Sequence, residues 1–215
     1  MIGHLREWLP QLANAAGETV EMMAAAYVLA LILGAVLALM RIAGPRPLAA
    51  AARAYIDVNR GTPVLALLFF IYFGLAEMGL VMSSYQAAVI GLAANSGAYI
   101  AEIFRAGVEA TPRGQLEAAR ALGLRRFQLA RRIVIPQMVT LTLPPLANQA
   151  VILIKETSVA SLIAAPELML RARDLASEYF MPLELYVAAG AVYFLLAFPA
   201  SMLARALELR LRIAR

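Results

Sequence analysis

Residues 22–40 read MMAAAYVLALILGAVLALM and contain no charged side chain. A helix that crosses a bilayer needs about 20 mostly apolar residues, so this stretch predicts a transmembrane helix. The whole chain of 215 residues is 62% hydrophobic and 15% charged. Soluble domains average about 45–50% apolar and about 25% charged residues. The composition therefore excludes an ordinary soluble enzyme and predicts an integral membrane protein.

Four further stretches have the length and hydrophobicity of spanning helices: 62–82, 85–104, 133–154 and 185–204. Prolines and polar side chains interrupt the third and fourth of them, but the apolar residues still dominate. We therefore predict an all-α integral membrane fold with five transmembrane helices. These helices form a single transmembrane domain over residues 1–215, with a long loop at 105–132.

The basic residues outside the spans predict the orientation. If the N-terminus lies outside the cell, the inward-facing segments are 41–61, 105–132 and 205–215, which carry 15 of the 19 Lys and Arg residues. Cytoplasmic loops of membrane proteins have such an excess of Lys and Arg. The N-terminus is therefore predicted outside and the C-terminus inside.

The segment 1–21 lacks the apolar stretch of a signal peptide. Its apolar side chains are spaced as on one face of a short amphipathic helix, which we expect at the outer interface: Leu5, Trp8, Leu9 and Leu12.

Small residues recur every four positions in the first span, at Ala26, Ala30, Gly34 and Ala38. Such a pattern allows close approach of another helix. It is also what an alanine-rich chain produces by abundance alone, and the sequence leaves both interpretations open.

Missing residue types exclude several kinds of chemistry. The chain has no Cys and a single His, His4, so neither a thiolate or multi-histidine metal site nor a histidine-dependent triad can form. Its only Lys, Lys155, is not part of a phosphate-binding GxxxxGK[ST] loop. We expect no catalytic residue, metal site or cofactor in this chain, and we place its basic excess in membrane loops rather than against a nucleic acid.

The loop after the third span carries the most specific pattern, GQLEAARALGLRRFQLARRIVIPQ at 114–137. Two short helical runs, 115–122 and 124–132, flank Gly123, a residue suited to a left-handed helix end. Charge alone indicates an ordinary basic cytoplasmic loop.

The spacing of this loop resembles the EAA loop of membrane subunits of bacterial ABC importers. The matching residues are Glu117-Ala118-Ala119, Gly123, Ile133, Ile135 and Pro136, with Ile135 in place of the usual Leu. The resemblance implies a coupling helix beginning near Gly114 that docks on an ATPase. The implied docking residues are Gly114, Gln115, Glu117, Ala118, Ala119 and Gly123.

Other segments resemble the polar amino acid branch of that family: Arg60-Gly61-Thr62-Pro63, LFFIYFGL at 68–75, Asn95-Ser96-Gly97-Ala98-Tyr99 and Lys155-Glu156-Thr157-Ser158. The resemblance implies a multi-pass permease subunit in a bacterial cytoplasmic membrane that imports a polar amino acid or another small polar solute. The implied partners are a second permease, the same or homologous, two cytoplasmic ATPase subunits that bind ATP and Mg²⁺, and an extracytoplasmic solute-binding protein.

Polar residues near the third and fourth spans are candidates for the substrate path: Asn95, Ser96, Lys155, Glu156, Thr157 and Ser158. The alternative, which the residue types favour, is a structural role for each of them, as hydrogen bonding between helices or as local capping and pairing. Glu102 lies three residues before Arg105, so it either forms a local ion pair or braces the bundle behind the loop.

Two other classes of function compete with transport. An intramembrane hydrolase would have to use Lys155 with Ser158 or Ser161, beside the neutralising Glu156. A non-transporting membrane scaffold would use only the basic inner loop, and it would not account for the resemblance of the other segments.

Overall fold

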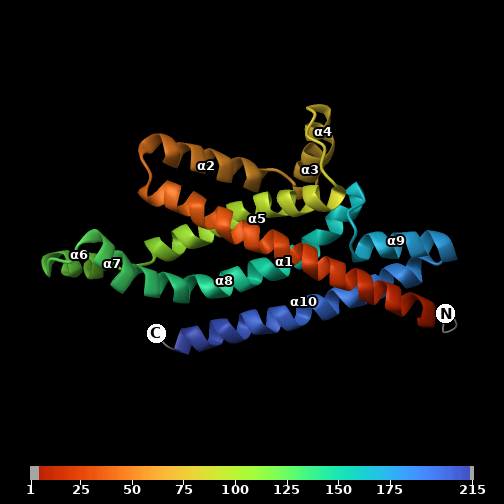
Figure 1. Ribbon diagram of the computed structural model, residues 1–215. Coiled ribbons are helices and arrows are strands. Elements are labelled where there is room, and N and C mark those ends of the chain that lie inside the picture. Colours follow the sequence, from red (N-terminus) through yellow and green to blue (C-terminus); the bar gives the residue numbers. More distant parts are fainter. Residues whose placement is uncertain (1–4, 214–215) are drawn as a thin grey trace.

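The computed structural model describes residues 5–213 and the side chains of residues 6–210, so the side chains of Leu5, Arg212 and Arg215 lie outside it, as does His4. Every regular element in this part of the chain is helical (Figure 1). The α-helices are α1 (Leu5–Ala43), α2 (Arg46–Gly61), α3 (Val64–Phe69), α4 (Leu75–Glu77), α5 (Ser84–Glu109), α6 (Arg113–Ala121), α7 (Arg126–Leu129), α8 (Ile135–Glu156), α9 (Leu168–Tyr179) and α10 (Pro182–Ile213). Two π-helical turns, Phe70–Gly74 and Ala130–Val134, and a 3₁₀ helix, Thr157–Ile163, join some of them.

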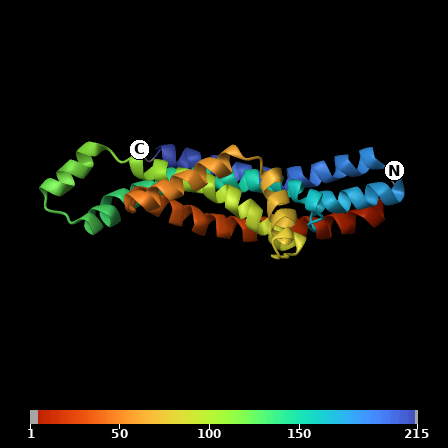
Figure 2. The same ribbon diagram turned by 90° about the horizontal axis from the view of Figure 1, so that it is seen from above.

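The long helices α1, α5, α8 and α10 form an elongated bundle, and α2 lies along α1 and α5 (Figures 1 and 2). The α6–α7 hairpin projects from one end of the bundle, and α9 lies at the other. Four of the described helices are long and apolar enough to cross a membrane, and a fifth crossing results if α2 and the α3–α4 segment count as one broken span. This arrangement confirms the predicted all-helical membrane class.

Helices α1 and α5 approach closely because glycine lies at their contact. A Cβ atom on Gly34 would lie 2.6 Å from the Ile100 Cγ2 atom, and one on Gly97 would lie 2.9 Å from Leu33 Cδ2. Three other members of the predicted small-residue row, Ala26, Ala30 and Ala38, are buried. The row is therefore a packing surface and not merely a consequence of abundant alanine.

The predicted span 62–82 is wrong at both ends. Its helix begins at Val64 and ends at Glu77, and the chain from Met78 to Ser83 is not helical. The axis of this segment is bent by 108° from that of α2. Pro63 favours the break, because a proline disfavours the helical conformation for the residue before it, and Thr62 is extended.

The segment 41–61, predicted to face inward, is mostly helical and forms α2. One face of α2 is buried against α1 and α5 through Ala52 and Ile56, which join a cluster with Leu37, Ala98 and Ala101. Three arginines on another face lower the average hydropathy of the segment, and this hid the helix from a search for uniformly apolar stretches.

The helix of the fourth span extends beyond its predicted start at residue 133. Helix α7 continues into α8 through the π-helical turn, in which the Ile135 N–H donates to the Ala130 carbonyl five residues back. The following Pro136 has no N–H, and a widened turn accommodates its ring. The second helical run of the loop is therefore the first part of one long rod, Arg126–Ile163.

The N-terminal amphipathic segment is not a separate surface helix, because α1 runs without interruption through it. Trp8 and Leu12 are buried in a cluster with residues of α9 and α10, whereas Leu9 is exposed. Part of the apolar face of this segment therefore packs on α9 and α10 rather than on the outer membrane interface.

Glu167 fastens the α9 end of the bundle. Its buried carboxylate accepts hydrogen bonds from the Met169 and Leu170 N–H groups at the start of α9 and from the Tyr193 hydroxyl of α10. The hydroxyl of Thr19 on α1 accepts the Leu168 N–H at 2.9 Å. Burial raises the pKa of the Glu167 carboxyl, and its hydrogen bonds oppose that rise.

The close contact of α1 and α5 predicts that a larger side chain at position 34 destabilises the protein. Gly34→Leu should lower the free energy of unfolding by about 2 kcal/mol or more, because the added side chain collides with α5. Gly17→Leu is the matched control on the same helix, since nothing lies within 4 Å of a Cβ atom there. Thermal unfolding of the purified variants in detergent measures the difference, and equal midpoints would contradict the packing role of Gly34.

Candidate functional site

A cavity of about 460 Å³ opens between α2, α5 and α8. Its polar lining consists of Arg60, Tyr99, Glu102, Arg105 and Gln149. These polar side chains would be costly at membrane depth if they faced only apolar neighbours. The cavity is therefore a candidate for a wet, solute-accessible part of the molecule.

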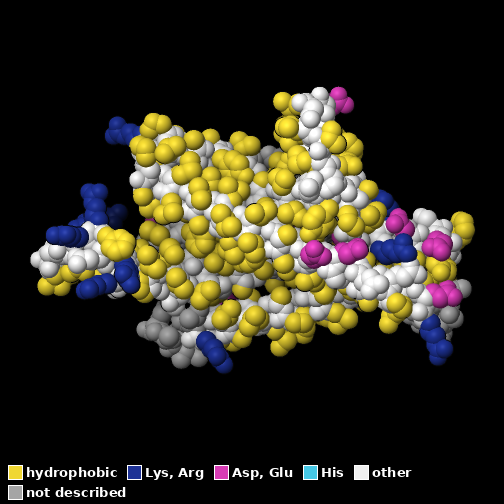
Figure 3. Space-filling view, in the orientation of Figure 1, with side chains coloured by type: hydrophobic (Ala, Val, Ile, Leu, Met, Phe, Trp, Pro, Cys, Tyr) yellow, Lys and Arg dark blue, Asp and Glu magenta, His cyan; other side chains and the backbone are white. Residues whose placement is uncertain are grey.

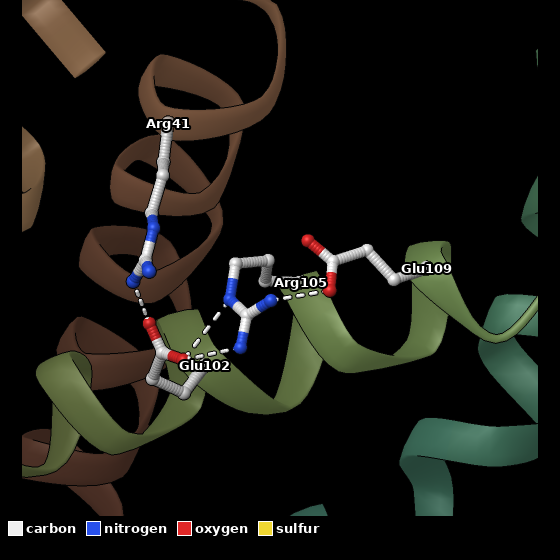
Figure 4. Close-up of polar contacts among 4 residues, drawn as sticks. All are labelled: Arg41, Glu102, Arg105 and Glu109. Carbon is white, nitrogen blue, oxygen red and sulfur yellow. Dashed lines mark hydrogen bonds and ion pairs between the residues drawn. The ribbon is translucent and has the colours of Figure 1, made fainter.

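Glu102 is the centre of an ion-pair network beside this cavity (Figure 4). One carboxylate oxygen accepts from Arg41 Nη1 near the end of α1, and the other accepts from Arg105 Nε and Nη2 at 3.0 and 2.8 Å. Arg105 also pairs with Glu109. Both sequence-based interpretations of Glu102 thus apply, since it pairs locally with Arg105 and its contact with Arg41 ties α1 to the part of α5 that leads into α6.

Arg60 is a cavity residue that the sequence analysis used only as part of a family pattern. Its guanidinium carbon lies 5.5 Å from the centroid of the Tyr99 ring, which is a cation–π contact. The i,i+7 spacing of arginines in α2 was the sequence signal that could have singled it out.

The predicted path residues Asn95 and Ser96 are buried in contacts between helices. The Asn95 side-chain amide donates to the Asn59 carbonyl of α2 at 3.0 Å, and the Gln149 amide donates to the Ser96 hydroxyl at 3.3 Å. These bonds join α5 to α2 and to α8 and favour a packing function. Only the partner of Ser96, Gln149, reaches the cavity.

The second predicted group, Lys155 to Ser158, lies where α8 gives way to the 3₁₀ helix and does not line this cavity. Thr157 and Ser158 donate their hydroxyl hydrogens to the Ile154 and Lys155 carbonyls, so both side chains cap the helix end. Lys155 is exposed, and Glu156 has one buried carboxylate oxygen without a hydrogen-bond partner. The bond of Ser158 to the backbone gives a serine–lysine hydrolase no support.

The predicted turn at Gly123 is present. Gly123 has φ +77°, and its N–H donates to the Arg120 carbonyl while the Leu124 N–H donates to the Ala119 carbonyl. This pair of bonds is a Schellman motif, which ends α6 and reverses the chain. Gln137 of α8 donates to the Gln115 side chain at 2.7 Å and fixes α6 to the long rod.

The α6–α7 hairpin presents a mixed basic and apolar surface (Figure 3). Gly114, Gln115, Glu117 and Ala118 are exposed, whereas Ala119 is buried. Leu122 and Phe127, which the sequence analysis did not select, are 80% and 74% exposed. Both of these large apolar side chains stand on the projecting hairpin, beside its arginines.

Comparison with known proteins assigns the family. Residues 21–213 match the family of the binding-protein-dependent transport system inner membrane component. The chain belongs to this family. It is 41% identical over 181 residues to an octopine transport system permease protein of Rhizobium meliloti, covering 80% of this chain and 74% of that protein. It is 33% identical to an arginine transport system permease protein of Bacillus subtilis, covering 95% and 94%.

The fold of this family member also matches a solved structure, described as an amino acid ABC transporter with histidines. The TM-score is 0.92 at 34% identity, with 96% of each chain covered. The chain is therefore a transport component of the inner membrane, a permease subunit and not itself an enzyme.

The Glu102 network predicts a loss of stability on neutralisation. Glu102→Gln should lower the free energy of unfolding by about 1–3 kcal/mol, because Arg41 and Arg105 would lose the carboxylate that lies between them. Glu109→Gln is the control, since its carboxylate side chain is 61% exposed and pairs only with Arg105. Thermal unfolding in detergent separates them, and an equal effect of the two changes would contradict a central role for Glu102.

Proposed function

We propose that the protein forms half of the translocation pathway of an ATP-driven importer for a polar amino acid or a close derivative. The support is the family membership together with the relatives, which are permeases of amino acid and opine transporters. The cavity beside Glu102 is the observation in this structure that carries the proposal, because it is a polar recess among otherwise apolar helices.

The proposed topology places the α6–α7 hairpin in the cytoplasm and the α9 end outside. Lys and Arg remain in excess on the hairpin side even when the α2 arginines are left out of the count. Helix α2 with α3–α4 then makes the second of five crossings, as a broken span.

The α6–α7 hairpin is the proposed contact with the ATPase. On this proposal Gly114, Gln115, Glu117 and Ala118 touch the partner, whereas Ala119 and Gly123 hold the shape of the hairpin. ATP and Mg²⁺ belong to two such ATPase subunits and not to this chain. A second permease, the same or homologous, and a solute-binding protein on the outer side complete the transporter.

Two rigid connections allow the hairpin to move the bundle. Helix α5 leads into α6 after a short turn, and α7 continues into α8 as one rod. A push on the hairpin is therefore transmitted to α5 and α8, two of the three helices that line the cavity, and alternating access follows from their rocking.

Pull-down from the native membrane tests the assembly. Tagged chain in mild detergent should retain a P-loop ATPase and a second permease, and proteoliposomes with the whole complex should take up radiolabelled L-glutamine or L-arginine when ATP is supplied. Recovery of the intact membrane complex without an ATPase would leave the scaffold as the better function.

Coupling is tested at the hairpin turn. Gly123→Val should leave membrane insertion intact but reduce substrate-stimulated ATPase activity by about tenfold or more, because a β-branched residue resists positive φ and displaces the hairpin. Gly79→Val is the matched control, since Gly79 has φ +85° far from the hairpin. Equal stimulation in the Gly123 variant and the wild type would contradict the coupling role.

A further inference from the structure

Three arginines lie in a single row on α2. Arg46, Arg53 and Arg60 are spaced by seven residues, so successive members differ by only about 20° around the helix. At about 1.5 Å per residue the row is about 21 Å long, with a guanidinium group about every 10 Å. We call these three residues the arginine row.

The arginine row lies beside helix segments of membrane character. The adjoining face of α2 packs through Ala52 and Ile56 on Leu37, which belongs to the uncharged stretch of α1, and on Ala98 of α5. An arginine at this level is costly in contact with lipid, and such residues face protein or water. The row therefore faces something other than lipid tails.

Two cavities border the row. Arg60 lines the one already described, and the second is an open recess on the surface of α2 alone, lined by Arg46, Arg53 and Asp57 together with three alanines, Ala49, Ala50 and Ala54. Small side chains between the arginines leave room for a solute along the helix.

The arginines of the row have no carboxylate partner within 4 Å in the part of the chain that the structure describes. Asp57, four residues after Arg53, forms no ion pair with it. Glu102 faces the same cavity as Arg60, but Arg41 and Arg105 occupy both of its oxygens. The row therefore makes no ion pair of its own in the described part of the chain, and Arg60 alone has a further contact, with the Tyr99 ring.

We propose that the arginine row lines the aqueous pathway and binds the carboxylate of the solute at successive positions during transport. A guanidinium group holds a carboxylate through two parallel hydrogen bonds. Every free amino acid has an α-carboxylate, so this contact selects amino acids as a class. It does not distinguish one amino acid side chain from another. The inference rests on the proposed function and adds to it the residues and the chemical group that they recognise.

The absence of cysteine from the chain allows a clean test by labelling. Ala50→Cys places a reporter in the second cavity and keeps all three arginines. Val58→Cys is the matched control, because Val58 is 64% exposed on the same helix but lies about 140° around it from Arg53. Thiols react with methanethiosulfonates as thiolates, which form in water and not in lipid.

The assembled transporter in proteoliposomes is treated with anionic ethylsulfonate and cationic trimethylammonium methanethiosulfonates. The Ala50→Cys reporter should react at least about tenfold faster than Val58→Cys and should prefer the anionic reagent. Millimolar L-glutamine should slow the reaction, whereas L-glutaminamide, which lacks the α-carboxylate, should not. Adding Arg53→Gln should reduce both the anionic preference and the protection by about threefold or more, and Arg205→Gln on α10 should change neither.

Other occupants of the row would give different results, each of which overturns the proposal. Protection that depends on phosphatidylglycerol in the vesicles and not on L-glutamine would identify a lipid headgroup. A reporter that reacts in the isolated chain but not in the assembled transporter would show that the second permease covers the row. Absence of ATP-dependent uptake by the wild-type complex would instead refute the proposed function, independently of the labelling.

Discussion

The contact between α1 and α5 is the constraint on which the rest of the structure depends. Gly34 and Gly97 allow the two helices to approach so closely that a single added methyl group would collide. In a bilayer, apolar side chains gain little from leaving lipid for protein, so dispersion contacts at short range must supply the association. The α1–α5 pair then provides the surface on which α2 packs on one side and α8 on the other.

The polar groups among the apolar helices are of two kinds: those with a hydrogen-bond or ion-pair partner on another helix, and those without one. Asn95, Ser96 and Gln149 have hydrogen-bond partners on neighbouring helices, and Glu102 has two cations. These groups hold helices together, because each would be costly if left alone. The arginines of α2 make no ion pair within the described residues, so their face of the helix is suited to water, an anion or another protein.

The apolar spans and the turn at Gly123 could be predicted from the sequence because each depends on local chemistry. Uniform hydrophobicity is enough for α1, and a glycine in a left-handed conformation is enough for the end of α6. Helix α2 was missed because its apolar face and its arginine face differ, and the average hydropathy of the segment conceals the apolar one. Hydrogen-bond partners such as Asn59 for Asn95 were beyond prediction, since they depend on how the α1–α5 pair orients its neighbours.

Two exposed surfaces of different character support the proposal that a second permease completes the pathway. A charged face on α2 and exposed aromatic side chains on the bent segment, Phe69, Phe70 and Phe73, point away from the bundle core. The two surfaces need different surroundings. The charged face of α2 needs a polar environment, and the phenylalanine side chains need an apolar one. A second permease placed across α2 would enclose water between two charged faces, while the phenylalanines contact lipid or the partner's apolar helices. In the proposed assembly, the second permease would also supply a further wall to the cavity bordered by α2, α5 and α8.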